Sequence, residues 1–384
     1  MTILVSGAIA NKLYNGGAAW TRLSYVLGLQ KLGFDVYFVE QIQPETCVDE
    51  TGASSAFECS ANVAYFKRIT DQMGLSGKAT LVDASTQSTE GLSYPDLLDI
   101  ASSASLLVNI SGHLSMSPLK EGAGRKVYID LDPGFTQFWY ASGCTAARLA
   151  GHDDYFSVGE NIGTADCIIP SGNIRWRPTR QPVLLDFWPV CGAGEQNRFT
   201  TIASWRGPYG PVEFAGKTFG SKVYQFRKYA DIPTCVDSTF EIALDIHPGD
   251  DRDRELLRRK SWRLADPKHV AADPESFQRY IQTSGSEFSV AQQIYVETHS
   301  GWFSDRTVRY LASGKPALVE DTGFSRNLPI GDGLVAFTSM QEAVSGAREI
   351  KQNYASHARC ARQLAETYFD SNLVLGKLIE EIGI

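Results

Sequence analysis

The chain has 384 residues, of which 43% are hydrophobic and 21% charged, and its formal net charge is −8. This composition excludes a disordered chain, a collagen-like fibre and a coiled coil. The acidic balance argues against a surface that binds duplex nucleic acid. No apolar run reaches the roughly 18–20 residues of a membrane span, and the N-terminus lacks the basic start of a signal peptide. The seven cysteines include no Cys-x-x-Cys pair, so we expect a reduced, cytoplasmic protein without a disulfide framework or zinc site.

In the first half of the chain, short apolar runs alternate with segments of helical periodicity. Strands are predicted at residues 2–8, 34–39, 79–82, 105–110, 126–131 and 155–158, and helices at 18–32, 61–73 and 94–102. Strands that alternate with helices pair in parallel through right-handed crossovers. The first half therefore predicts a doubly wound α/β domain.

Prolines interrupt the pattern after residue 170, and we place a linker at residues 186–198. The alternation then restarts, with strands predicted at 199–203, 240–246, 290–297 and 316–320 and helices at 221–230, 251–262, 304–312, 340–354 and 356–369. We expect an N-terminal domain over 1–190, a C-terminal domain over 191–370, and a final helix over 371–384 that packs back on the first domain. Two such domains place a ligand cleft between the carboxyl ends of their sheets.

One segment of the second half combines features that suit an anion. Ser304 is a predicted N-cap, Asp305 lies in the first helical turn, and Gly301 permits close approach of a ligand. The free N–H groups of a helix N-terminus bind phosphate, and Arg306 adds a bidentate donor. An ordinary packing loop with a capped helix is the alternative. The chain carries no Gly-x-Gly-x-x-Gly and no P-loop, which disfavours a dehydrogenase or a P-loop NTPase.

The run Ala312-Ser-Gly-Lys-Pro316, a short apolar strand, Asp321-Thr-Gly323 and then Gly331-Asp-Gly-Leu-Val-Ala-Phe337 resembles the C-terminal domain of GT-B-fold glycosyltransferases. The likeness is to the glycosyl-transferase-group-1 and spore-maturation-like branch. It implies two tandem Rossmann-like domains and a nucleotide-diphosphate sugar (UDP-, GDP- or dTDP-linked) as donor, with no tightly bound cofactor and no metal. It also implies that the donor diphosphate and sugar lie near Ser300, Gly301, Trp302, Phe303, Ser304, Asp305, Arg306, Asp321, Thr322 and Gly323.

The sequence departs from this family in one motif. Many retaining relatives carry Glu-x7-Glu, but the two positions are Gly301 and Arg309 here. Recognition of the ribose must therefore differ, and Glu287 is a candidate to take its hydroxyl. A retaining mechanism does not follow from this motif.

Further donor contacts are expected from loops that follow first strands. In relatives a Gly-Gly loop reaches the donor, which implies such a role for Gly16 and Gly17, although a plain turn is the alternative. Relatives also supply an Arg/Lys pair to the donor phosphates. Arg206 fits the first role, and Lys222 and Lys217 compete for the second.

Three side chains at strand ends of the first half are candidates for the acceptor side. Transfer to a hydroxyl needs a general base, which is usually Asp, Glu or His. Asp132, His113 and Asp130 fit this need, although Asp132 also suits a plain Asp-Pro turn.

We therefore expect a glycosyltransferase whose first domain binds an acceptor of unknown kind: a small molecule, a glycan or a modified nucleic acid. Three alternatives remain open. They are a nucleotide-sugar hydrolase or epimerase of the same fold, a glycosyltransferase acting on DNA bases, and an inactive module that binds sugar nucleotides. The sequence predicts no oligomeric state.

Overall fold

The computed structural model describes residues 1–192, 195–207 and 209–384, so the predicted linker at 186–198 lies partly outside them. The first half forms one eight-stranded sheet in the order β4-β3-β2-β1-β5-β6-β7-β8, parallel except for the β3–β4 pair. Its strands are β1 (Thr2–Ser6), β2 (Asp35–Ile42), β3 (Ala79–Asp83), β4 (Thr89–Glu90), β5 (Leu106–Ile110), β6 (Arg125–Asp130), β7 (Asp154–Ser157) and β8 (Trp176–Pro178). Its helices are α1 (Gly16–Lys31), α2 (Ala61–Gln72), α3 (Tyr94–Ser103), α4 (Ser117–Gly122) and α5 (Phe135–Ala141).

The second half forms a six-stranded parallel sheet in the order β13-β12-β9-β14-β15-β16. Its strands are β9 (Arg198–Ser204), β12 (Thr239–Asp245), β13 (Arg263–Ala265), β14 (Ser286–Ser289), β15 (Ala317–Glu320) and β16 (Leu334–Phe337), and a separate hairpin comprises β10 (Val212–Phe214) and β11 (Lys217–Phe219). Its helices are α6 (Lys222–Lys228), α7 (Ile232–Cys235), α8 (Asp251–Arg259), α9 (Pro267–Val270), α10 (Pro274–Thr283), α11 (Gln293–Glu297), α12 (Asp305–Ala312), α13 (Met340–Gln352), α14 (Tyr354–Tyr368) and α15 (Ser371–Ile382).

Both sheets reverse their strand order in the middle, between β1 and β5 and between β9 and β14. This is the doubly wound order, and ligands bind at the carboxyl ends of the strands where the order reverses. The predicted fold class of two tandem Rossmann-like sheets is therefore confirmed. None of the helices in the described part of the chain is long and apolar enough to cross a membrane.

The strand predicted at residues 290–297 is wrong. The strand β14 ends at Ser289, and residues 293–297 form the short helix α11 instead. The run is apolar, but its buried residues Ile294 and Tyr295 are neighbours on one helical turn rather than alternate residues of a strand. The hairpin β10–β11 was not predicted, and its Phe214 and Phe219 stack on Phe138 of α5 in the first half.

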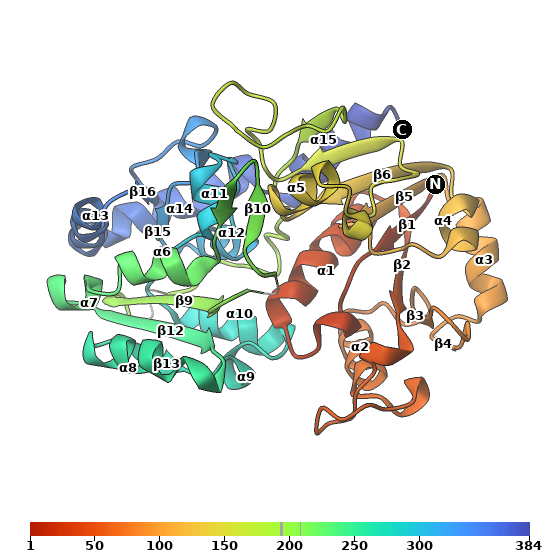
Figure 1. The fold of residues 1–384 in the computed structure, drawn as a ribbon, viewed down its shortest axis with the longest axis horizontal. Coiled ribbons are helices and arrows are strands. Elements are labelled where there is room, and N and C mark those ends of the chain that lie inside the picture. Colours follow the sequence, from red (N-terminus) through yellow and green to blue (C-terminus); the bar gives the residue numbers. More distant parts are fainter. Residues whose placement is uncertain (193–194, 208) are drawn as a thin grey trace.

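The two halves share a continuous apolar core. Ile3 and Val5 of β1 belong to the same cluster of buried residues as Val308 of α12 and Leu375 of α15. Figure 1 shows α15, in dark blue, lying beside the yellow and orange elements of the first half, and α15 contacts α1.

Helix α1 packs its first turn directly on the second half. The Gly16 N–H donates to Ala271 O at 2.8 Å, and the Trp20 indole donates to Pro274 O at 2.8 Å. A Cβ atom on Gly16 would lie 2.1 Å from Asp273 O, which is closer than real contacts allow. The glycine at this position is therefore required by the contact between α1 and α10.

We predict that Gly16→Ala destabilises the protein by about 1–3 kcal/mol, because the backbone of residue 273 has to move. Gly376 of α15 is the matched control, since a Cβ there meets nothing within 4 Å. Gly376→Ala should leave stability unchanged or raise it by up to about 1 kcal/mol through helix propensity. Urea unfolding of the three proteins measures both effects, and equal stability of Gly16→Ala and wild type would contradict the packing described.

Candidate active site

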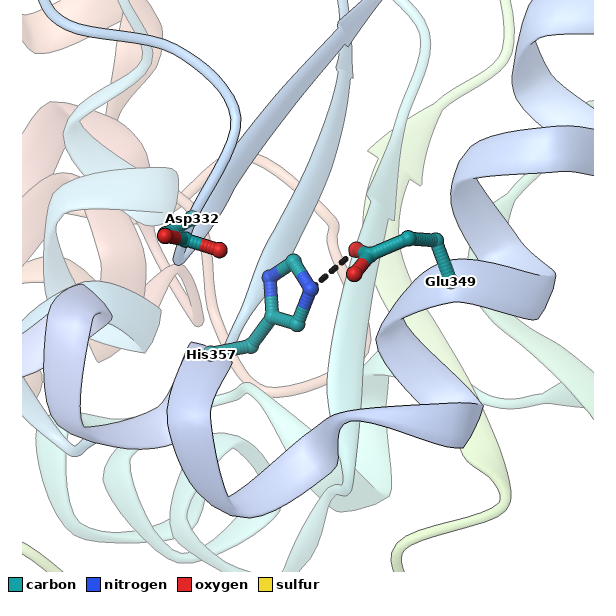
Figure 2. A group of neighbouring side chains, drawn as sticks. All are labelled: Asp332, Glu349 and His357. Atoms are coloured by element: carbon teal, nitrogen blue, oxygen red, sulfur yellow. Dashed lines mark ion pairs between the residues drawn. The ribbon is translucent and has the colours of Figure 1, made fainter.

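Within the described residues, one group of three His, Cys, Asp or Glu side chains places its ligand atoms within 4.8 Å of one another: Asp332, Glu349 and His357 (Figure 2). The Nδ1 atom of His357 accepts the Gly333 N–H at 2.9 Å, so the ring proton sits on Nε2, which donates to Glu349. Both ring nitrogens are thus engaged, and the imidazole offers no lone pair to a metal. This cluster joins α13 to α14 and is structural.

Asp132 lies just beyond the carboxyl end of β6, where the sequence placed it. It is half-buried, and the Tyr295 hydroxyl of the second half donates to its Oδ1 at 3.2 Å. Burial, with a further contribution from the charge of Asp130, raises the pKa of Asp132 to about 6. A carboxylate with this pKa is ionised at neutral pH and accepts a proton more readily than an ordinary aspartate.

Asp130 has a different environment from Asp132. It is 1% exposed and accepts hydrogen bonds from Thr136, Gln137 and Ser157 side chains and from the Asp132 N–H. These bonds fix the turn that carries Asp132. Of the two aspartates predicted as bases, the structure therefore leaves only Asp132 open to a substrate.

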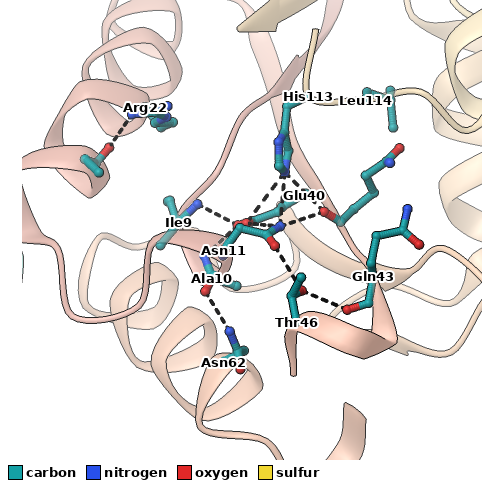
Figure 3. Close-up of polar contacts among 12 residues, drawn as sticks. Ile9, Ala10, Asn11, Arg22, Glu40, Gln43, Thr46, Asn62, His113 and Leu114 are labelled. Atoms are coloured by element: carbon teal, nitrogen blue, oxygen red, sulfur yellow. Dashed lines mark hydrogen bonds and ion pairs between the residues drawn. The ribbon is translucent and has the colours of Figure 1, made fainter. Parts of the chain in front are cut away.

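His113 follows β5 and lies in a network that the sequence did not predict (Figure 3). Its Nε2 donates to Gln41 O at 3.1 Å and lies 3.7 Å from the buried Glu40 carboxylate. Glu40 accepts the N–H groups of Ile9, Ala10 and Asn11 at 2.7–2.8 Å. Burial raises the pKa of Glu40 to about 7, against the opposing effect of these donors.

The protonation state of His113 follows from the same geometry. A carbonyl oxygen only accepts, so the proton sits on Nε2 and the neutral ring keeps a lone pair on Nδ1. Burial lowers the pKa of His113 to about 3, helped by the positive charges of Arg22, Arg148 and Lys12. The imidazole is therefore neutral at physiological pH.

In the second half, Lys222 lies at the N-terminal end of α6. It is half-buried, and burial together with the charge of Arg306 lowers the pKa of its ammonium to about 7. The carboxylates of Glu287 and Glu320 oppose this shift, but in the described part of the chain neither pairs with Lys222 at ion-pair distance. Burial raises the pKa of Glu320, at the end of β15, to about 7. The competing candidate, Lys217, is paired with Glu297 at 2.8 Å.

Arg306 does not point at open space, contrary to its predicted role as a direct phosphate ligand. Its guanidinium donates to Glu287 Oε1 at 2.6 Å, to Ile202 O at 2.8 Å and to Ser289 Oγ at 2.7 Å. The Glu287 side chain is 0% exposed, so it does not reach a ribose hydroxyl as predicted. The Arg306–Glu287 pair was not predicted from the sequence, because the two residues are 19 positions apart and each was interpreted separately as a ligand contact.

The predicted cap of α12 is present, since Ser304 Oγ accepts the Arg306 N–H at 3.3 Å. The first turn of this helix also meets α1. Thr21 of α1 donates to Asp305 Oδ2 at 2.8 Å, and Arg309 donates to the same oxygen at 2.9 Å. Arg309, which occupies the second glutamate position of the family motif, is buried in this contact.

The loop around Asp321 is held by Asn161, an asparagine from the first half of the chain. Asn161 donates through Nδ2 to His299 O at 2.9 Å and to Gly323 O at 3.0 Å, and its N–H donates to Ser300 O. Asp321 Oδ1 accepts the Gly323 N–H at 2.8 Å, and Thr322 Oγ1 donates to Trp302 O. These side chains shape the loop, and Gly301 is packed directly against Asn161.

The remaining predicted donor residues lie as follows. Arg206, just after β9, is 70% exposed on its side chain and forms a bidentate pair with Asp250. Trp302 stacks on Tyr295 with ring centroids 4.4 Å apart, and Phe303 is buried against Phe324. Gly16 and Gly17 pack on Asp273 and Phe277, so a contact with the donor stays a prediction for them.

No protein-family model matches the sequence, and no curated protein matches it. Solved structures do match over the whole chain. An alpha-glucosyltransferase in complex with UDP has a TM-score of 0.61 at 10% identity, and all of each chain is covered. Anabaena Alr3699/HepE in complex with UDP-glucose has a TM-score of 0.61 at 10% identity, covering 100% of this chain and 99% of that one. Sucrose-phosphate synthase from Thermosynechococcus elongatus has a TM-score of 0.55 at 9% identity with the same coverage.

This chain has the GT-B fold. At identities near 10%, the likeness shows the fold alone. The particular glycosyltransferase branch suggested by the sequence stays a prediction.

We predict that Arg306→Met destabilises the protein by about 3–5 kcal/mol, because it leaves the Glu287 carboxylate buried without its partner. The double variant Arg306→Met/Glu287→Gln removes both charges and should recover most of that loss. Chemical unfolding measures both values. A stable Arg306→Met variant that had merely lost nucleotide binding would instead support the direct phosphate contact.

Proposed function

We propose that the protein transfers a sugar from a nucleotide-diphosphate sugar to an acceptor hydroxyl. The observation that carries this proposal is the ammonium of Lys222 at the start of α6, which has no ion-pair partner among the described residues and lies within the electrostatic reach of Arg306, Glu287 and Glu320. It accompanies a half-buried Asp132 that follows the first sheet and contacts the second domain through Tyr295. The GT-B neighbours, some of which hold UDP or UDP-glucose, support this reading.

Lys222 serves as the counter-charge for the donor diphosphate. A cation held in a partly desolvated position needs an anion, and a diphosphate arriving there raises the pKa of the lysine and keeps it protonated. Arg206 is the second cation. Its guanidinium leaves the Asp250 carboxylate and binds the donor phosphate instead. With these two positive charges the leaving group is neutralised without a metal.

Asp132 serves as the general base. The acceptor oxygen forms a bond to the anomeric carbon while the bond from that carbon to the diphosphate oxygen breaks. The electron pair leaves with the nucleoside diphosphate, and the acceptor proton passes to Asp132. The neutral imidazole of His113, with its lone pair on Nδ1, accepts a hydrogen bond from a sugar hydroxyl. If water replaced the acceptor, the same groups would hydrolyse the donor, and product analysis separates the two outcomes.

The donor site is tested by the pH dependence of UDP affinity. From about pH 7 to pH 9 the terminal phosphate, whose pKa is near 6, is already ionised, so its own titration does not contribute. Because the pKa of free Lys222 is about 7, the lysine must take up a proton on binding above that pH. Affinity should therefore fall by up to about tenfold per pH unit.

Lys222→Arg and Lys222→Met are the paired variants for this test. Because arginine stays charged, the UDP affinity of the Lys222→Arg variant should not change between pH 7 and pH 9. The Lys222→Met variant should bind UDP weakly over the whole range. Isothermal titration measures each dissociation constant. Failure of UDP, GDP and dTDP to bind the wild-type protein would contradict the proposed donor site.

The proposed base is tested by the pH–rate profile. Asp132 acts only when deprotonated, so kcat/KM should fall below about pH 6 and reach a plateau above it. Asp132→Asn should lower kcat by about 100- to 10,000-fold. Tyr295→Phe removes a donor that stabilises the carboxylate, so the acid limb should move to higher pH. Asp99→Asn, at an exposed position on α3, is the control, and an unchanged rate in Asp132→Asn would exclude this base.

A further inference from the structure

Three cations lie on the first-domain side of the proposed site without a carboxylate ion-pair partner among the described residues. Lys12 and Arg22 are half-buried and Arg148 is exposed, and none of them forms an ion pair with a carboxylate in the described part of the chain. Their positive charges act on the same imidazole, that of His113. In a protein with a net charge of −8, a group of cations without carboxylate ion pairs among the described residues is a specific feature of this place.

Arg22 is the best-placed member of this cluster. Its Nη1 donates to Ala18 O at 3.2 Å (Figure 3). Its Nε is fully buried and has no hydrogen-bond partner among the residues that the structure describes. The chain leaves room for this side chain, since a Cβ on Gly7 would lie 2.7 Å from Arg22 Cγ. A buried guanidinium N–H without an acceptor is costly. The Nε atoms of Arg198 and Arg309 also lack an acceptor, but those two side chains are paired with carboxylates. Arg22 has no such pair among the described residues, so an acceptor from outside the protein would satisfy it.

The other two cations are fixed near the same point by their neighbours. Arg148 donates from Nη1 to the carbonyl oxygen of His113 at 3.3 Å. Lys12 ends the 3-10 helix that carries Asn11, whose amide lies 3.3 Å from His113 Nε2. The carboxylate that Arg22 and Lys12 face, Asp132, lies beyond ion-pair distance and is bonded to Tyr295.

We propose that Lys12, Arg22 and Arg148 form a subsite for a carboxylate or phosphate group carried on one of the two sugar substrates. The inference rests on the proposed glycosyl transfer, since it places this anion beside the base, Asp132. The charged group belongs either to the acceptor, as in a sugar phosphate, or to the donor, as in a uronic acid. Both present the same chemistry: oxygen acceptors with negative charge, which guanidinium groups bind as a fork.

The test compares charged and neutral sugars on the full-length protein. In the acceptor arm, glucose 6-phosphate and glucuronate are titrated against glucose, with and without UDP. In the donor arm, UDP-glucuronate is titrated against UDP-glucose. We expect the charged compound of one arm to bind at least about tenfold more tightly, and the arm that responds identifies the source of the anion.

Arg22→Gln should abolish this preference while leaving UDP affinity unchanged, and Arg22→Lys should retain part of it. Arg252→Gln is the matched control, because Arg252 is exposed on α8 and in a different domain. Lys12→Gln tests the same subsite independently if Arg22→Gln fails to fold. Equal binding of charged and neutral sugars in both arms, or a preference that survives in Arg22→Gln and Lys12→Gln, would overturn the subsite. Absence of UDP binding would instead overturn the donor site, while the titrations without UDP still decide the subsite.

Discussion

Each sheet of this protein is organised by a buried charged side chain where its strand order reverses. In the second half of the chain, Arg306 joins the start of α12 to β9 through Ile202 O and to β14 through Glu287 and Ser289. The position of the α12 N-terminus therefore depends on an ion pair enclosed by protein. Because a buried charge without its partner is strongly destabilising, this helix end cannot drift from the sheet edge without a large loss of stability.

In the first half of the chain, an acidic side chain rather than a basic one fixes the loop at the sheet edge. Glu40, on β2, collects three consecutive backbone N–H groups from the loop that follows β1. That loop carries Lys12, and its anchor also lies beside His113, which follows β5. Thus the loops that flank the reversal in both sheets are fixed by buried side chains that are bonded within the protein. Preorganised groups of this kind let the exposed residues act without rearrangement.

The sequence predicted what depends on local signals. Strands that alternate with helices gave both sheets, Ser304 was identified as a cap from its neighbours, and Asp132 was placed at a strand end by its position after an apolar run. What was missed depends on contacts between distant residues. Arg306 and Glu287 are 19 positions apart, and Asn161 and Gly323 are 162 positions apart. Neither contact can be predicted from hydrophobic periodicity, which reports only on neighbouring residues. The packing of Gly16 and Gly17 on Asp273 and Phe277 of the second half also could not be predicted from the sequence, and their contact with the donor stays a prediction.

Cationic side chains that are paired with a carboxylate have a structural role here, whereas those without such a pair are the candidates for binding a ligand. Arg306, Arg309 and Arg206 each have a carboxylate partner within the protein, so their appearance in a motif says little about ligands. Lys222 on one side, and Lys12 with Arg22 on the other, have none among the described residues while being partly withdrawn from water. Desolvation makes an unpaired cation costly. Such cations in both halves of the chain therefore favour the proposed substrates, which carry negative charge on each side. In the proposed function the donor diphosphate neutralises Lys222 in the second half only, and this is why we propose a second anionic group for the cations of the first half.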